Sequence, residues 1–293
     1  MDTSHTQPIR IDAHHHLWRY QAPGYAWMAD EMKSLRRSFS LTDLHEVTST
    51  SGVMGTVLVE VERTEEETRY LTSIATTDDL VQGVVGWVDL TAPSILSDLE
   101  RVAQLPKLRG LRHPIHDEPD LHYILRDDFN RGITALRSFG LTYDLLIFED
   151  HLPQTISFVD RHPNQTFILD HIAKPRIREG SFHPWRENIL ELARRPNVYC
   201  KLSGMINEAS WTEWTTPMLR PYIDTVIEAF SPWRVMFGSD WPLVTLASTY
   251  EEWLSTVHSA IAGLSSSEQQ WIQAWSAMEA YGLPKALTAQ MQK

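Results

Sequence analysis

The chain has 293 residues, enough for one large domain, and a single α/β barrel typically needs about 250. Its formal net charge of -12 argues against nucleic acid or an anionic membrane as a partner, and no apolar run approaches the roughly 20 residues of a membrane span. The single cysteine, Cys200, excludes an intrachain disulfide and fits a reducing compartment, so we expect a cytoplasmic protein.

Residues 1–8 are polar and lack the apolar core of a signal peptide, so we expect a flexible tail there. Eight strand-like runs follow, nearly continuous in apolar residues, as expected for parallel strands covered on both faces. The runs are 9–13, 55–61, 83–88, 108–112, 141–147, 166–170, 198–202 and 234–238. Most of them are spaced by about 25–37 residues, the length that a βα unit needs.

Helix signals occupy most of the intervals. Thr64 followed by three glutamates forms a capping box that also places negative charge in the first helical turn. Asp127 can cap a helix over 128–139, which Gly140 would end. Further helices are predicted over 184–195 and 217–230, and in 245–293, where Ser265-x-x-Glu268 opens a final capping helix.

Eight βα units predict a closed (β/α)8 TIM barrel, as one domain spanning residues 9–293 with a C-terminal capping helix. A doubly wound sheet is the alternative, but no Gly-x-Gly-x-x-Gly follows the first strand. The segment 18–39 is a long first loop. It predicts either a lid or substrate wall, or a surface excursion whose aromatic residues pack on the barrel.

The most informative motif is Ile11-Asp12-Ala13-His14-His15-His16, at the end of the first strand. Side chains alternate along a strand, so His14 and His16 point the same way and His15 points away. The last strand ends on Asp240, and His171 follows the sixth strand. In an α/β barrel the C-terminal ends of the strands meet at the catalytic mouth, so these four groups are expected to converge.

Five motifs, taken together, resemble the amidohydrolase superfamily, in the branch that contains L-fuconolactonase, L-rhamnonolactonase and 2-pyrone-4,6-dicarboxylate lactonase. They are Ile11–Trp18 (Ile-Asp-Ala-His-His-His-Leu-Trp), Arg109–His113 (Arg-Gly-Leu-Arg-His), Leu169–Pro175 (Leu-Asp-His-Ile-Ala-Lys-Pro), Lys201–Gly204 (Lys-Leu-Ser-Gly) and Phe237–Pro242 (Phe-Gly-Ser-Asp-Trp-Pro). The resemblance extends from about residue 9 to residue 243 and implies a (β/α)8 barrel that hydrolyses a cyclic ester. Some members of this branch use a divalent metal and others do not.

Two departures from the superfamily pattern bear on the metal. The fifth strand carries no histidine before His151, and the fourth has no lysine that could be carboxylated to bridge two ions. A binuclear site is therefore not expected. His14, His16 and Asp240, with His171 or Glu60 as a further ligand, could hold one divalent ion, zinc being the first choice. The other interpretation of Glu60 is a carboxylate paired with an arginine inside the barrel.

Ester chemistry assigns the remaining roles. Asp240 is expected to take a proton from the attacking water, and His171 to orient that water or protonate the leaving oxygen. The expected substrate wall consists of Trp18, Arg112, His113, His116 and Trp241, because sugar rings stack on indole rings and their hydroxyls bond such polar groups. This wall predicts an aldonolactone, such as L-fucono-, L-galactono- or L-rhamnonolactone, as the substrate.

Three alternatives stay open at this stage. A decarboxylase of an aromatic or enol carboxylate on the same fold would share the paired histidines and the late aspartate. A dicarboxylate lactonase would need several convergent arginines. A non-catalytic barrel that only binds metal or sugar would not need Asp240 as a base. The sequence leaves a homo-oligomer open.

Overall fold

The computed structural model describes residues 9–284, so the predicted tail over residues 1–8 lies outside the described part. Eight parallel strands are hydrogen-bonded in chain order, from β1 to β8. Their bounds are Arg10–His15 (β1), Val53–Val59 (β2), Val81–Gly86 (β3), Leu108–Pro114 (β4), Thr142–Leu146 (β5), Phe167–Leu169 (β6), Val198–Leu202 (β7) and Val235–Phe237 (β8). The predicted (β/α)8 barrel is confirmed.

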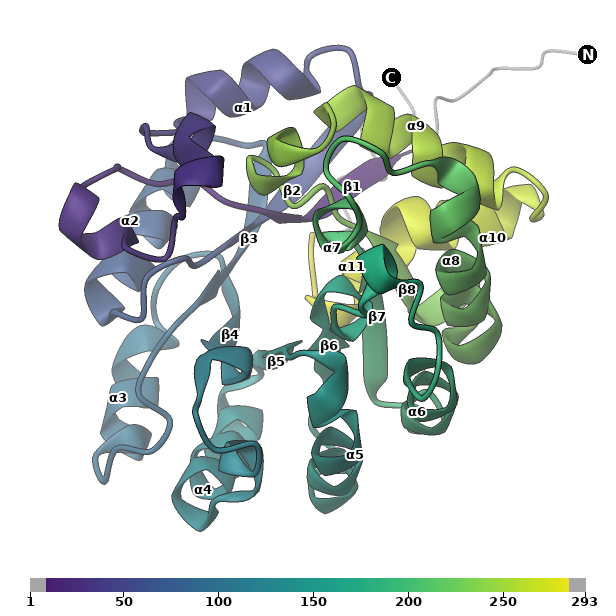
Figure 1. Ribbon diagram of the computed structural model, residues 1–293. Coiled ribbons are helices and arrows are strands. Elements are labelled where there is room, and N and C mark those ends of the chain that lie inside the picture. Colours follow the sequence, from purple (N-terminus) through teal and green to yellow (C-terminus); the bar gives the residue numbers. More distant parts are fainter. Residues whose placement is uncertain (1–8, 285–293) are drawn as a thin grey trace, which may run out of the picture.

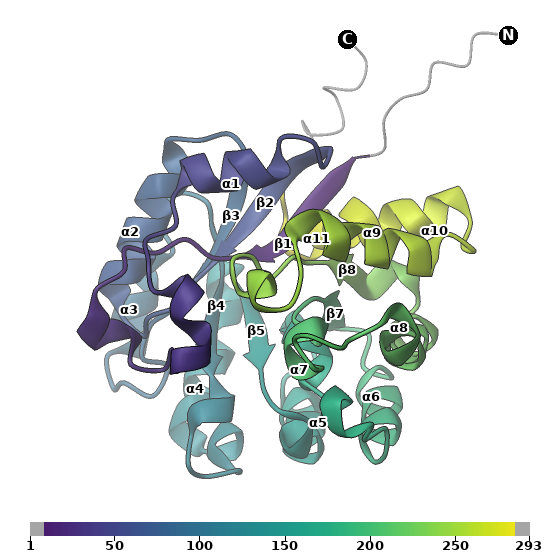
Figure 2. The same cartoon turned by 45° about the horizontal axis from the view of Figure 1, so that its top comes forward.

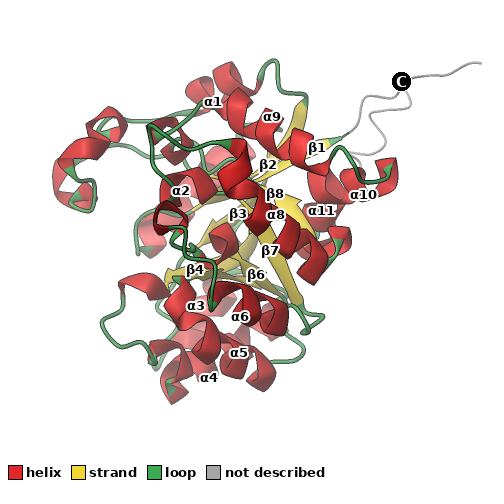
Figure 3. Ribbon diagram, turned by 45° about the vertical axis from the view of Figure 1, so that its right-hand side comes forward, coloured by secondary structure: helices red, strands yellow, loops and turns green. Residues whose placement is uncertain are grey.

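The helices lie around the outside of these strands (Figures 1 and 3). They are α1 Leu41–Thr48, α2 Glu65–Thr76, α3 Ile95–Val102, α4 Asp127–Leu136, α5 Leu152–Arg161, α6 Trp185–Leu192, α8 Thr216–Phe230 and α9 Tyr250–Ile261. A short helix, α7 (Met205–Glu208), sits between β7 and α8. Within residues 9–284 the helices are too short or too polar to cross a bilayer.

Most of the helix caps predicted from the sequence are present in the structure. The Thr64 side chain accepts a hydrogen bond from the backbone N–H of Glu67, and Ser265 and Glu268 form a reciprocal capping box. Gly140 takes a φ of 66°, the left-handed conformation that ends a helix. The interpretation of Asp127 as a cap was wrong: it is the first residue of α4, and Arg126 precedes the helix.

The later part of the C-terminal helical segment packs against β1 and β8. The segment comprises α10 (Ser266–Gln270), a π-helical turn (Trp271–Trp275) and α11 (Ser276–Ala280), and it lies beside β1 and β8 in Figure 2. Buried side chains from its later part share one apolar cluster with Ile11, Val57 and Met236 of the strands. A second, larger cluster fills the space between the strands and the outer helices.

The barrel closes between β1 and the segment that follows β8. The backbone N–H of Asp240 donates to the carbonyl of His14 (2.8 Å), and that of His16 donates to the carbonyl of Trp241 (2.7 Å). The Asp12 carboxylate accepts from the backbone N–H of Ser239 (2.8 Å) and from its hydroxyl (2.6 Å). This closure places both predicted histidines directly beside Asp240.

Candidate active site

Three imidazoles surround one oxygen of Asp240. Its Oδ1 atom lies 3.5 Å from Nε2 of His16, 3.7 Å from Nε2 of His14 and 3.9 Å from Nε2 of His171. All four side chains are buried, and this Oδ1 has no hydrogen-bond partner among the described residues. The structure therefore brings together the four groups that the sequence singled out.

Neighbouring groups fix how the imidazoles are oriented. Nδ1 of His16 lies 2.8 Å from the carbonyl oxygen of Val59, which can only accept, so Nδ1 donates this hydrogen bond and the ring is held with Nε2 toward Asp240. Nδ1 of His171 lies 2.9 Å from the hydroxyl of Ser203. Contacts of this kind lock the ring position before any ligand arrives.

The backbone after β6 is unusual, because four successive residues, 171–174, have φ values between 46° and 64°. This left-handed turn costs free energy for residues with a side chain, and it aims the His171 ring at Asp240. Gly204, with φ 64°, packs on that ring, where an added Cβ would lie 2.5 Å from Nδ1. Only glycine fits both the conformation and the contact.

The surroundings keep Asp240 charged and keep His14 and His171 neutral. Burial alone would raise the pKa of Asp240, but His171, His16 and His14 hold it well below the ordinary range. Burial lowers the pKa of His171 to about 4, against the opposing effect of Asp240. Burial and the neighbouring Lys201 ammonium lower the pKa of His14 well below its usual value. At neutral pH Asp240 is therefore a carboxylate, and His14 and His171 are neutral.

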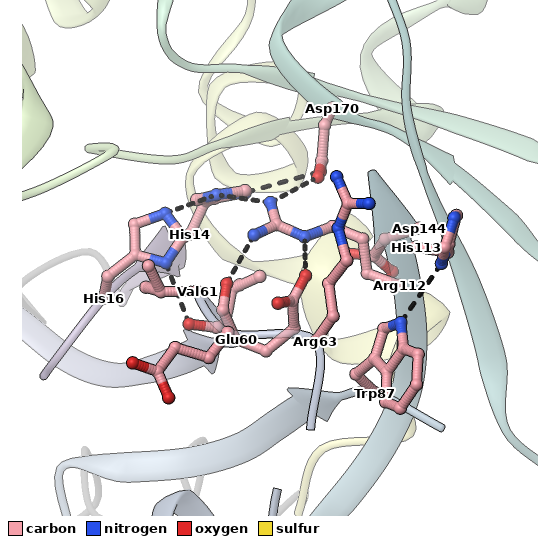
Figure 4. Close-up of polar contacts among 12 residues, drawn as sticks. His14, His16, Glu60, Val61, Arg63, Trp87, Arg112, His113, Asp144 and Asp170 are labelled. Atoms are coloured by element: carbon pink, nitrogen blue, oxygen red, sulfur yellow. Dashed lines mark hydrogen bonds and ion pairs between the residues drawn. The ribbon is translucent and has the colours of Figure 1, made fainter. Parts of the chain in front are cut away.

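A buried charge network lies directly beneath these groups, comprising Glu60, Arg112, Asp144, Asp170 and Lys201. Nζ of Lys201 lies 2.6 Å from Oδ2 of Asp144 and 2.8 Å from Oδ1 of Asp170. Arg112 donates to Oε1 of Glu60 (2.7 Å) and to Oδ2 of Asp170 (3.1 Å), as the dashed lines in Figure 4 show. Lys201 and Arg112 also approach His14, at 3.1 Å and 3.4 Å, so the network contacts this histidine directly.

The donor set of His14, His16 and Asp240 fits one small divalent cation. Two neutral imidazoles and a carboxylate are ordinary zinc ligands, and tetrahedral bonds of about 2.0–2.1 Å put ligand atoms roughly 3.3 Å apart. Nε2 of His14 and Nε2 of His16 are separated by 3.2 Å, and the orphaned Oδ1 of Asp240 lies 3.5 Å from the latter. Glu60 is not part of this cluster. Its carboxylate is paired with Arg112, which is the alternative that the sequence left open.

A cavity of about 830 Å³ opens above these groups at the C-terminal ends of the strands. His16, Arg112, His171 and Asp240 line its floor. The long first loop, purple in Figure 1, contributes Gly24, Trp27 and Met32, so that segment forms part of the cavity wall. A volume of this size accommodates a monosaccharide-sized ligand.

The chain matches the Amidohydrolase family profile over residues 11–283. This protein belongs to the amidohydrolase family. It is 36% identical to an L-fucono-1,5-lactonase of Burkholderia multivorans over 97% of this chain and 99% of that one. It is also 36% identical to an L-fucono-1,5-lactonase of Burkholderia ambifaria, over 84% of this chain and 86% of the relative.

A solved structure shares both the fold and the sequence. The crystal structure of an amidohydrolase from Burkholderia multivorans with bound zinc superimposes with a TM-score of 0.90 at 36% identity, covering 94% of this chain and all of that one. The zinc belongs to that protein's structure. In the present amidohydrolase, His14, His16 and Asp240 form a ligand cluster that fits the same type of ion.

The predicted substrate wall is only partly on the cavity surface. Arg112 and His116 line the cavity. His113 lies behind it, where Nε2 contacts Glu118 (2.7 Å) and Nδ1 accepts from Trp87 (3.1 Å; Figure 4). Trp18 and Trp241 are buried, 1% and 2% exposed, and pack on Phe39. These two indoles support the wall from behind.

Sequence reasoning did not single out Lys174, Asn207 or Trp211, which also line the cavity. Nδ2 of Asn207 donates to Oδ2 of Asp240 (3.2 Å), which holds the carboxylate in place. The indole N–H of Trp211 donates to the carbonyl of Asn207 (3.0 Å). A usable signal was present, since Asn207 follows the Lys-Leu-Ser-Gly motif by three residues, at the end of a barrel strand.

Proposed function

We propose that this amidohydrolase opens a sugar lactone of the L-fucono-1,5-lactone type to the sugar acid. One observation carries the proposal: an ionised, anchored carboxylate with a free oxygen lies among three imidazoles at the floor of a sugar-sized cavity. The 36% identity of this chain to an L-fucono-1,5-lactonase, over nearly the whole length of both chains, supports the substrate class.

Asp240 acts as the general base in this proposal. Its Oδ1 takes a proton from water, the water oxygen forms a bond to the lactone carbonyl carbon, and the carbonyl electron pair moves onto oxygen. Because Asn207 binds Oδ2, the carboxylate is fixed with Oδ1 free for this task. A lowered pKa keeps this carboxylate ionised, and so in the form that can act as a base, at neutral pH.

The negative charge that develops on the carbonyl oxygen needs nearby positive potential. Arg112 lines the cavity, lies 3.4 Å from His14, and stays charged at every working pH because Glu60 and Asp170 raise its pKa. A divalent ion held by His14, His16 and Asp240 supplies Lewis acidity toward the same carbonyl when it is bound.

Collapse of the tetrahedral adduct breaks the bond between the carbonyl carbon and the ring oxygen. The proton held by Asp240 passes to that oxygen, which becomes a hydroxyl, and the new carboxylic acid releases a proton to solution. Of the two roles considered for His171, orienting the water is favoured, because a pKa of about 4 leaves its imidazole neutral at pH 7.

The charges of the cavity favour a neutral lactone over a dicarboxylate. Its two arginines, Arg63 and Arg112, are already paired with carboxylates of the protein. Burial, together with the nearby Lys174 and Arg112, lowers the pKa of His116 to about 2, so this side chain is also neutral. Lys174 is then the one lysine or arginine of the lining without an ion-pair partner in residues 9–284, which is too little to bind two carboxylates.

A pH-indicator assay against a panel of aldono-1,5- and 1,4-lactones, with and without prior chelation, tests the proposal. We expect acid release from L-fucono-, L-galactono- or L-rhamnonolactone by the purified protein. Failure across the whole panel, or release of CO2 from an aromatic carboxylate in a parallel assay, would contradict it.

We also propose that the enzyme acts in the cytoplasm, because the lone cysteine is buried and unpaired.

A further inference from the structure

Two charged side chains on the cavity wall, Lys174 and Glu208, have no hydrogen-bond or ion-pair partner among residues 9–284. Both are half-buried. The Lys174 ammonium lies 5.5 Å from the centre of the Phe148 ring. A partly desolvated charge without a partner costs free energy, and the cost is recovered when a ligand supplies the missing hydrogen bond.

Both residues are tied closely to the catalytic groups. Lys174 ends the left-handed turn that begins at His171. Glu208 directly follows Asn207, which holds Asp240. The contact of Gly204 with the His171 ring packs the loop after β6 against the loop after β7. The positions of the ammonium and the carboxylate relative to the reacting centre are therefore fixed by the fold.

Lys174 and Glu208 line the same cavity and do not form an ion pair with each other. Burial raises the pKa of Glu208, and Lys174 is the largest influence that lowers it, yet the pair is farther apart than a salt bridge. A ligand that fits between them must offer an acceptor to Lys174 and a donor to Glu208. Hydroxyl groups offer both, and Trp211 and Phe148 supply apolar surface for the C–H faces of a ring.

We propose that Lys174 and Glu208 bind hydroxyls of the lactone ring and restrict the enzyme to polyhydroxylated lactones. The inference rests on the proposed function and adds the residues that select the substrate. Lys174 donates to a hydroxyl oxygen, and Glu208 accepts a hydroxyl hydrogen, each as a charge-assisted hydrogen bond. A lactone without hydroxyls leaves both groups unsatisfied and is discriminated against for that reason.

The kinetic test compares two substrates. For Lys174→Met and Glu208→Ala we expect kcat/KM on L-fucono-1,5-lactone to fall by about 10–100-fold, mainly through KM, because each loses a charged hydrogen bond. On δ-valerolactone, which has no hydroxyls, we expect less than about a two-fold change. Lys174→Arg should restore part of the loss. Glu100→Ala, at an exposed site on α3, is the matched control.

Equal losses on both substrates, or an unchanged KM for the sugar lactone, would overturn the inference. Calorimetric binding of the 1,5-lactam of L-fuconic acid separates its failure from that of the proposed function. In an Asp240→Asn background we expect Lys174→Met to weaken lactam binding at least about ten-fold. That result supports the inference even if the wild-type protein opens no lactone. Unchanged lactam binding refutes the inference, whatever the wild-type activity.

Discussion

The floor and the wall of the cavity differ in whether their charged side chains are paired with an opposite charge. On the floor, the buried charge network pairs every cation: Lys201 contacts Asp144 and Asp170, and Arg112 contacts Glu60 and Asp170. On the wall, Lys174 and Glu208 have side chains without partners in residues 9–284. On the floor, Oδ1 of Asp240 also lacks a hydrogen-bond partner among these residues.

This difference distinguishes charged groups that stabilise the structure from charged groups that are available to bind a ligand. Paired buried charges hold a geometry, because removal of one partner leaves an uncompensated charge in a poorly solvated place. Unpaired groups at the mouth keep hydrogen-bonding capacity for a ligand. His14 lies at the boundary, with Nδ1 near Lys201 of the network and Nε2 near His16 of the site. The predictions below test this division, in order of expected effect.

Asp240→Asn should abolish turnover, with kcat at least about 10³-fold lower, because the amide cannot take the proton from water. The fold should survive, since the new amide side chain is nearly isosteric with the carboxylate that it replaces. Lactone hydrolysis and thermal unfolding measured on the same preparation check both points. Asp224→Asn, on the exposed face of α8, is the control. Activity near that of the wild type would remove Asp240 as the base.

Lys201→Met should lower the free energy of unfolding by about 3–5 kcal/mol, because Asp144 and Asp170 then lose their shared buried cation. Denaturant unfolding measures the change. Arg220→Met breaks an exposed pair with Asp224 and should cost less than about 1 kcal/mol. Similar losses for the two variants would contradict the structural role of the network.

Replacing both His14 and His16 with alanine should weaken zinc binding by at least about 100-fold, since outer-shell partners alone contribute 10–100-fold to metal affinity. Dialysis against zinc followed by elemental analysis gives the stoichiometry, and His258→Ala, on α9, is the control. Full zinc content in the double variant would assign the ligands to other residues.

Asn207→Ala should lower kcat about ten-fold with little change in KM, because the carboxylate of Asp240 loses the donor that holds Oδ2. Steady-state kinetics on the preferred lactone measure both constants. Exposed Asn164→Ala is the matched control. An equal rise in KM would instead indicate that Asn207 binds the substrate.

The smallest effect concerns pH. Asp240 and His171 both act in their deprotonated forms, and both have lowered pKa values, the latter about 4. Deprotonated groups with lowered pKa values remain competent as pH falls. The acid limb of the kcat/KM profile should therefore lie below about pH 5 and not near the usual histidine value of about 6.5. A limb centred near 6.5 would show that an imidazole with an ordinary pKa controls turnover.

Much of the fold was predictable because its signals are local. Continuous apolar runs located all eight strands to within a few residues, and the capping residues Thr64 and Ser265 marked two helix starts. The period-two geometry of a strand likewise predicted that His14 and His16 share a face.

What escaped prediction depends on which way a side chain points in three dimensions. Trp18 and Trp241 were expected on the substrate wall, but indoles pack into the core as readily as they line a cavity, and the sequence does not distinguish the two. The charge of Lys201 is fully buried and is compensated by Asp144, on β5, and Asp170, directly after β6. Those partners are 57 and 31 residues away along the chain, so no local pattern reveals them.

Hydrolysis of L-fucono-1,5-lactone in ¹⁸O-labelled water tests the central claim most directly. Attack of activated water on the carbonyl carbon predicts one heavy oxygen in the product, located by mass spectrometric fragmentation in the carboxylate. Label in the ring-derived hydroxyl would show that the alkyl–oxygen bond breaks instead. Enzyme-dependent CO2 release without labelled sugar acid would contradict the lactonase account altogether.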